Sequence, residues 1–133
     1  FVNIPVISDD SGICIKGLKG KPGIYSARLA KKHGSFFKAM KFILKKMKNK
    51  QNRKATFVCS LSYKKKNKKI ISVEGRLKGN ISSKILGKKG FGYDPIFIPL
   101  NRKSTFGQML KSKKIKMDHR FIAFQKLKKK IKI

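Results

Sequence analysis

The sequence predicts an α/β domain in which a mixed β-sheet is flanked by helices. One observation is an apolar repeat at helical spacing, formed by Phe36, Met40, Ile43, Leu44 and Met47. Residues 54–63 instead alternate apolar and polar side chains, which indicates a half-buried strand. A second helical repeat follows Asp118. The order of helix, strands and helix favours α/β or α+β with a mixed sheet.

The first part of the chain contains shorter elements. Residues 5–8 form a predicted buried strand, which ends at a polar turn over residues 9–12. Residues 13–15 are the expected returning strand, and the glycine-rich segment 17–23 is the expected loop. Ser35 is a suitable N-cap for the first helix.

The second part begins with a basic turn over residues 64–69. Two further strands are expected over 70–77 and 79–86, where Gly75 and Gly79 indicate a bulge or a close backbone approach. Residues 95–99 form a short strand between two prolines. The last helix begins after Asp118, with Phe121, Phe124 and Leu127 on one face.

The length of 133 residues fits one domain, and an apolar fraction of 40% is enough for a core. A wholly disordered basic tail is therefore excluded. The chain starts at Phe1, without methionine and inside a predicted strand. We therefore expect residues 1–133 to be a single domain that lacks its N-terminal segment.

The chain carries 36 Lys and Arg against 5 Asp and Glu, for a net charge of +31. Such a polycation suits a polyanionic partner such as nucleic acid. The alternative is a compositional bias toward lysine, because lysine runs occur along the whole chain and arginine, which reads bases bidentately, is rare. Both interpretations stay open at this point, and a sequence-specific nucleic-acid contact is not expected.

Cys14 and Cys59 are too few for a disulfide framework, so a reducing cytoplasm is the expected location. No stretch reaches the 18 or more apolar residues of a membrane span. No charged segment followed by an apolar one suggests a secretory signal.

Asp9, Asp10, Ser11 and Gly12 follow a hydrophobic strand directly. Adjacent carboxylates repel each other unless a cation or a proton lies between them. Mg²⁺ binds one or two carboxylates and completes its shell with water and substrate phosphates. The motif therefore indicates a metal–phosphate site, with a plain polar turn as the alternative.

Residues 87–95 combine three glycines with Phe91, Tyr93 and Asp94 ahead of a proline. The ring of Phe91 offers a flat face for a nucleobase, and Asp94 can accept hydrogen bonds from a purine N–H. The glycine spacing matches neither the Walker nor the Rossmann phosphate-binding motif. The alternative is a glycine-rich turn whose aromatic side chains lie in the core.

His119 and Arg120 fall in the first turn of the last helix, where the helix dipole disfavours positive charge. Asp118 is accounted for as the N-cap. An anion or an acceptor would compensate the two basic side chains, so this segment indicates a binding site. Two solvated surface residues are the alternative, and His33 is assigned to the surface.

Together these segments resemble the inosine triphosphate pyrophosphatase (Ham1-like) family, which acts on non-standard purine nucleoside triphosphates. The matching segments, in the family's order and spacing, are residues 9–12, 22–28, 90–97, 105–107, and the single motif of Lys114 followed by 119–120. The resemblance extends from residue 5 to about residue 127. Five motifs in register make it specific.

The resemblance implies a Mg²⁺-dependent hydrolase that converts ITP, dITP and XTP to the monophosphate and pyrophosphate, and a homodimer. Asp10 would be the catalytic proton acceptor and a metal ligand, with Asp9 as a second metal ligand. The implied substrate-binding residues are Ser11, Phe91, Gly92, Tyr93, Asp94, Lys114, His119 and Arg120. Arg28 would contact a phosphate or support the fold.

The chain departs from the family pattern in three respects. Gln108 stands in place of Glu and Asp118 in place of Ser. The family's N-terminal Thr-Gly-Asn loop, a downstream Lys and a metal-binding Glu have no counterpart in this sequence. We therefore expect the chain alone to be weakly active or inactive. A lysine-rich nucleic-acid-binding protein and a non-catalytic nucleotide-binding remnant are the alternative functions.

Overall fold

The computed structural model describes residues 4–132, and its centre is a five-stranded sheet of order β2-β1-β3-β4-β5. The strands are β1 (Val6–Ile15), β2 (Lys21–Gly23), β3 (Lys54–Lys64), β4 (Ile71–Ile81) and β5 (Phe97–Pro99). Helices flank this sheet, so the expected α/β class is confirmed. The strand pairs within residues 4–132 are all antiparallel. The sheet is therefore antiparallel and not mixed. Short connections, residues 16–20 between β1 and β2 and residues 65–70 between β3 and β4, favour antiparallel pairing, since a parallel pair needs a longer crossover.

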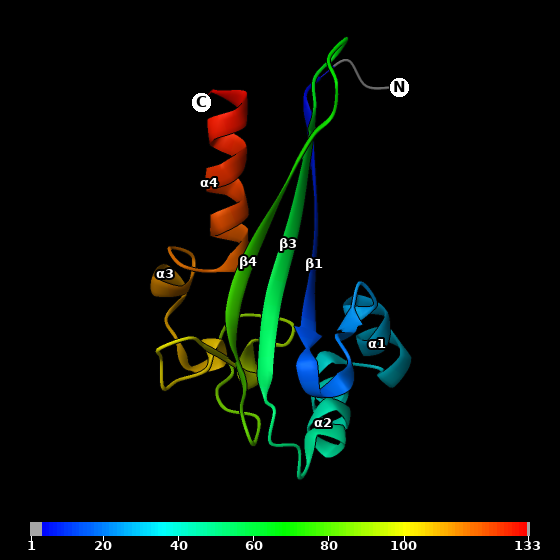
Figure 1. Ribbon diagram of the computed structural model, residues 1–133, viewed down its shortest axis with the longest axis vertical. Coiled ribbons are helices and arrows are strands. Elements are labelled where there is room, and N and C mark those ends of the chain that lie inside the picture. Colours follow the sequence, from blue (N-terminus) through cyan, green and yellow to red (C-terminus); the bar gives the residue numbers. More distant parts are fainter. Residues whose placement is uncertain (1–3, 133) are drawn as a thin grey trace.

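The helices are α1 (Ser26–His33), α2 (Phe36–Met47), α3 (Lys111–Lys114) and α4 (His119–Ile131). Both expected caps are confirmed: Ser35 Oγ accepts from the Lys38 N–H at 3.1 Å, and Asp118 Oδ1 accepts from the Phe121 N–H at 2.8 Å. Figure 1 shows α4 along the upper part of the sheet, with α1 and α2 beside its lower end. None of the helices in residues 4–132 is long and apolar enough to cross a membrane.

Residues 9–12 lie inside β1 and form no turn, so the expected break between two short strands is wrong. β1 pairs with β3 in an unbroken register, from Val6 opposite Lys64 to Ile15 opposite Ala55. The backbone of β3 supplies hydrogen-bond partners all along the polar segment, and this ladder outweighs the low strand propensity of its Asp, Ser and Gly residues. As a result, consecutive side chains of the motif point to opposite faces of the sheet.

β4 is one strand, Ile71–Ile81, where the sequence indicated two. Of the two interpretations of its glycines, the close backbone approach is confirmed. A Cβ atom at Gly75 would collide with the backbone of α4 at His119 and Ala123, and one at Gly79 with β5. The absence of side chains at these positions lets α4 and β5 lie directly on the strand. The expected strand over 95–99 is shorter, since a 3₁₀ turn (Asp94–Ile96) precedes β5.

The sheet has one covered face and one open face. Phe57, Cys59 and Leu61 of β3 are buried on the covered face, the last two beneath Ala123 and Leu127 of α4. The alternate residues, such as Ser60, face the open side and are more exposed. An antiparallel sheet tolerates this arrangement when the open face is polar. The face on which a β1 side chain lies therefore determines its neighbours.

Candidate active site

A cavity of about 760 Å³ lies between β1, the loop before the 3₁₀ turn of Asp94, α3 and α4. We call it the site pocket. It is lined by Ile7, Asp9, Leu61, Gly90, Phe91, Met109, Lys111, Lys114, Ile115, Asp118, Arg120, Phe121 and Phe124. Residues separated by more than 100 positions in the sequence thus share one cavity. Four of the predicted site residues are among them: Asp9, Phe91, Lys114 and Arg120.

Asp94 and Lys114 form a buried ion pair at the back of this pocket. Lys114 Nζ donates to Asp94 Oδ2 at 2.6 Å, and the two side chains are only 5% and 3% exposed. The Phe91 N–H donates to the same carboxylate oxygen at 3.0 Å. Burial raises the pKa of Asp94, while the hydrogen bond and charge of Lys114 oppose that rise. Asp94 therefore shapes the loop and holds Lys114, and its Oδ2 is occupied by these two donors.

Phe91 is the aromatic surface of the site pocket. Its side chain is 60% exposed, although it is large and apolar. Two cations lie near the ring: Lys114 Nζ at 4.3 Å from the centroid and Arg120 Cζ at 5.3 Å. Both lie within the range of cation–π attraction. The arrangement suits a flat, electron-rich ligand with acceptor groups at its edge.

His119 is buried at the first turn of α4, where it is only 4% exposed. Its ring stacks on Phe57 with 4.6 Å between centroids and an interplanar angle of 13°. Burial lowers the pKa of His119 to about 4, so the ring is neutral at pH 7. Its Nδ1 is buried and has no hydrogen-bond partner within residues 4–132. A neutral imidazole can offer either a donor or an acceptor there.

Arg120 extends from α4 to β1. Its Nη2 lies 3.0 Å from Asp9 Oδ2 and 3.3 Å from Ser11 Oγ. Its Nε is buried and lacks a hydrogen-bond partner in the described part of the chain. The guanidinium group thus joins the polar motif of β1 to Phe91 and keeps its buried Nε–H donor free.

Asp10 lies on the other side of the sheet. Its cross-strand partner is Ser60, which in turn pairs with Glu74 of β4, so these three side chains share the open face. Glu74, for which the sequence gave no role, forms an ion pair with Arg76 at 2.5 Å. Two strand spacings separate Asp10 from Glu74, roughly 10 Å, which is too far for one Mg²⁺ to bind both.

The residues present fit Mg²⁺ through Asp10 alone. No group of three His, Cys, Asp or Glu side chains within residues 4–132 could hold a metal ion. Asp9 is on the opposite face and is engaged by Arg120. A single exposed carboxylate is enough where water and substrate phosphates complete the shell.

Tyr93 and Gly92, both predicted to bind substrate, do not line the site pocket. Tyr93 is buried and its hydroxyl donates to the Ser26 carbonyl oxygen at 2.6 Å. Burial raises the pKa of Tyr93 to about 12. Ser26 in turn accepts from the Ile13 N–H and donates to the Gly23 carbonyl oxygen. Tyr93 therefore ties the Phe91 loop to β1 and α1.

Sequence reasoning missed Ser26 and Phe57 as supports of the site. Phe57 was visible only as a member of the alternating strand, and nothing in its pattern indicates a histidine above it. Gln108 is explained by the structure. Its Oε1 accepts from the Thr105 N–H at 3.0 Å and closes a capping box, which Gln and Glu complete equally well.

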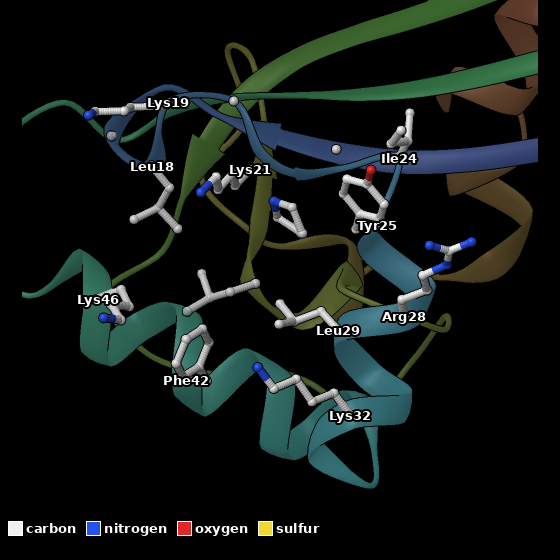
Figure 2. Close-up of a pocket in the computed structure, with 15 residues that line it drawn as sticks. Leu18, Lys19, Lys21, Ile24, Tyr25, Arg28, Leu29, Lys32, Phe42 and Lys46 are labelled. Carbon is white, nitrogen blue, oxygen red and sulfur yellow. The ribbon is translucent and has the colours of Figure 1, made fainter.

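A second cavity of about 880 Å³, which we call the helix pocket, lies between the 17–25 segment, α1 and α2. Figure 2 shows Leu18, Leu29 and Phe42 pointing into it, with basic side chains around the rim. Arg28 lines this cavity, with its Cζ 5.4 Å from the centroid of the Tyr25 ring. Arg28 is therefore not part of the site pocket.

The fold and the site can be compared with known proteins. The model of the Ham1 family matches residues 2–130. The chain belongs to the Ham1 family. It is 46% identical over 134 residues to a dITP/XTP pyrophosphatase of Borreliella burgdorferi, covering 96% of this chain and 66% of that protein. The similar enzyme of Dictyoglomus thermophilum is 46% identical over 128 residues, with 93% and 62% covered.

Solved Ham1 structures agree with this fold. The Staphylococcus aureus Ham1 protein superposes with a TM-score of 0.91 at 36% identity, covering 98% of this chain and 68% of that one. A dITP/XTP pyrophosphatase from Mycobacterium abscessus gives a TM-score of 0.79 at 31% identity, with 95% and 65% covered. The chain thus spans about two thirds of the length of the Ham1 relatives that it matches.

Proposed function

We propose that this Ham1 chain forms the base-recognition part, and one catalytic carboxylate, of a pyrophosphatase for non-standard purine nucleoside triphosphates. The substrates would be ITP, dITP and XTP, and the products the monophosphate and pyrophosphate. One observation carries the proposal: an exposed Phe91 ring lies beside Lys114 and Arg120 in a single pocket. Relatives named dITP/XTP pyrophosphatase support it.

Base selection follows from the excess of donors around the ring. A purine stacked on Phe91 would present its edge to Lys114 and to the free N–H of Arg120. A 6-oxo purine offers acceptors at that edge. The 6-amino group of adenine is itself a donor and would leave the buried protein donors unpaired. Such a mismatch discriminates strongly against the wrong ligand.

The reaction needs water to attack the α-phosphorus, so that the bond from this phosphorus to the bridging oxygen breaks and pyrophosphate leaves. Asp10 accepts the proton of that water in our proposal. At residues 9–11, β1 pairs only with β3 among the described strands, because β2 pairs with residues 13–15. A nucleotide could therefore cross this edge, with its base on the α4 face and its phosphates near Asp10. Bound Mg²⁺, held by Asp10, would supply positive charge to the phosphates.

Pyrophosphate release from ITP, XTP, ATP and GTP, measured with Mg²⁺, tests the proposal. The protein should be assayed with any residues that precede Phe1 in its expressed form. We expect ITP and XTP to be preferred over ATP, and Asp10→Asn to lower turnover roughly 10²- to 10⁴-fold. Equal rates on ATP and ITP would contradict base selection. Undiminished turnover in Asp10→Asn would contradict the catalytic role of this carboxylate.

Binding measurements beside this assay separate the two alternative functions. A remnant that only binds nucleotides would bind ITP without releasing pyrophosphate. A nucleic-acid-binding protein would lose affinity as salt rises, with a slope of about −0.9 per neutralised phosphate of duplex DNA. Hydrolysis of a small nucleotide is not expected to follow that slope.

Two further features of the proposal concern the assembly of the protein and its location in the cell. The family resemblance predicts a homodimer, which light scattering on the purified protein would test. A cytoplasmic location agrees with Cys14 and Cys59 both being free. Fluorescence imaging of the tagged protein in its own cell would test that location.

A further inference from the structure

We propose that the two adjacent carboxylates of β1 have separate roles. Asp9 is a positioning residue that holds Arg120 against Phe91, and Asp10 alone serves the metal and the phosphates. The inference rests on the proposed function and deepens it. It also replaces the sequence-based expectation that both carboxylates bind Mg²⁺.

The register of β1 separates the two side chains. Asp9 pairs with Leu61 and Ser11 with Cys59, and these two β3 residues are buried beneath α4. Asp9 and Ser11 therefore face α4, since cross-strand partners share a face. Asp10 pairs with exposed Ser60 and faces the other way. One metal ion cannot bind both carboxylates without a break in this register, because Mg²⁺ requires ligands at 2.0–2.1 Å.

Asp9 has a partner on its own face. Its Oδ2 lies 3.0 Å from Arg120 Nη2, and Ser11 Oγ is 3.3 Å from the same nitrogen. The guanidinium carbon is 5.3 Å from the centroid of the Phe91 ring. Arg120 is thus held from the strand side while its remaining surface is turned toward the ring that we expect to stack on the base.

Charge balance explains why Arg120 needs this partner. Lys114 and Arg120 both lie over Phe91, so two like charges occupy one small region. Asp94 neutralises Lys114 inside the pocket, and Asp9 neutralises Arg120 at its edge. Arg120 is also in the first turn of α4, where the helix dipole disfavours a cation. Without Asp9, repulsion from Lys114 and from the helix would move the guanidinium group away from the ring.

The test compares the same substitution at neighbouring positions, Asp9→Asn and Asp10→Asn. Binding of IMP, which needs no triphosphate contact, and of ITP with and without Mg²⁺ is measured by calorimetry. We expect Asp9→Asn to weaken IMP binding roughly tenfold, as for the loss of one oriented charged hydrogen bond. Mg²⁺ should still strengthen ITP binding in that variant. Asp10→Asn should instead remove the strengthening by Mg²⁺, and Asp9→Glu should recover part of the IMP affinity.

A ligand-free readout keeps this inference separate from the proposed function. The side-chain Nε–Hε resonance of Arg120 should shift in Asp9→Asn and keep its position in Asp10→Asn. Loss of the Mg²⁺ effect in Asp9→Asn, with IMP affinity retained, would overturn the inference. The inference would also be overturned if the Arg120 resonance kept its position in Asp9→Asn while circular dichroism showed that this variant is folded. If the wild-type protein binds IMP no better than AMP, base selection is refuted. The Arg120 resonance would still test the contact between Asp9 and Arg120.

Discussion

The site pocket and the helix pocket have similar volumes but differ in how their basic side chains are paired with carboxylates. The helix pocket is the larger, about 880 Å³ against 760 Å³. Its rim carries Lys19, Lys21, Arg28, Lys32 and Lys46, and the residues that line it include no carboxylate. In the site pocket, Lys114 and Arg120 each have a carboxylate partner. Paired, oriented charges therefore distinguish a candidate active site better than cavity size does.

The difference has a physical reason in this lysine-rich chain. An exposed lysine on a rim remains hydrated and mobile. Its charge therefore costs little folding free energy, and it does not hold a ligand in one orientation. A buried cation such as Lys114 must be paired, since an unpaired buried charge is costly. With only five acidic residues available, each carboxylate near the site pocket has an assignable partner or cap. Matched substitutions at the two pockets test this contrast.

The substitution with the largest expected effect on stability is at Asp94. Asp94→Asn should lower the free energy of unfolding by about 3–5 kcal/mol, because the Lys114 ammonium group would remain buried without its counter-ion. Urea denaturation measures the change. Lys32→Gln, on the rim of the helix pocket, is the control and should change stability by less than about 0.5 kcal/mol.

A double variant sharpens this prediction. Asp94→Asn combined with Lys114→Met removes both charges and should recover much of the loss. Equal losses in Asp94→Asn and Lys32→Gln would mean that the pair is no more constrained than a surface lysine. The contrast between the pockets would then fail.

The next largest effect is a pH dependence from His119. Its folded-state pKa of about 4 lies below the unfolded value of 6.5, so the unfolded chain binds the additional proton between these limits. Stability should be constant with respect to this group above pH 6.5 and fall as the pH decreases toward 4. The total loss is about 3 kcal/mol at most. Urea denaturation at pH 4.5, 5.5 and 7.5 measures it.

His33 provides the matched control, since it contacts Phe42 beside the helix pocket. His119→Asn should flatten the profile between pH 4 and 6.5, and His33→Asn should leave it in place. A profile that flattens only in His33→Asn would contradict the assignment.

A smaller effect is expected from the hydroxyl of Tyr93. Tyr93→Phe leaves the Ser26 carbonyl oxygen without its buried donor and should cost about 1–2 kcal/mol. Tyr25→Phe, at the helix pocket, removes a hydroxyl from an exposed side chain and should cost less than about 0.5 kcal/mol. Thermal unfolding of both variants distinguishes them. Equal shifts would show that the Tyr93 hydroxyl is not needed to tie its loop to α1.

Local patterns of the sequence predicted much of this fold. The caps Ser35 and Asp118 and the alternating strand 54–63 are properties of neighbouring residues, and the structure confirms them. β1 was misread because its pairing with β3 is set by residues at least 40 positions away. Helix α1 was missed because its short apolar face gains stability only against the rest of the core.

The sequence motifs predict which side chains could form a site, but not how those side chains are arranged in space. The motifs named Asp9 and Asp10 together, and only the strand register places them on opposite faces. Tyr93 was grouped with Phe91 because both lie in one glycine-rich loop, yet one ring is buried and the other exposed. Which side of a strand or loop meets a cavity is decided by tertiary packing, which no local spacing encodes.

The smallest expected effect is at the helix cap beside the site pocket. Asp118→Ser should change the free energy of unfolding at pH 7 by less than about 0.5 kcal/mol, since both residues accept the Phe121 N–H as N-caps. Ser35→Ala, at the helix that borders the helix pocket, removes a cap and should cost about 1 kcal/mol. The charge of Asp118 raises the pKa of His119 against the effect of burial, so Asp118→Ser should lower that pKa further and steepen the loss of stability in acid. Urea denaturation at pH 7 and pH 4.5 separates the two effects. A loss above about 1.5 kcal/mol at pH 7 exceeds what exchanging one good cap for another can cost. Such a loss would mean that the charge of Asp118, and not only its cap, stabilises the basic side chains of the site pocket.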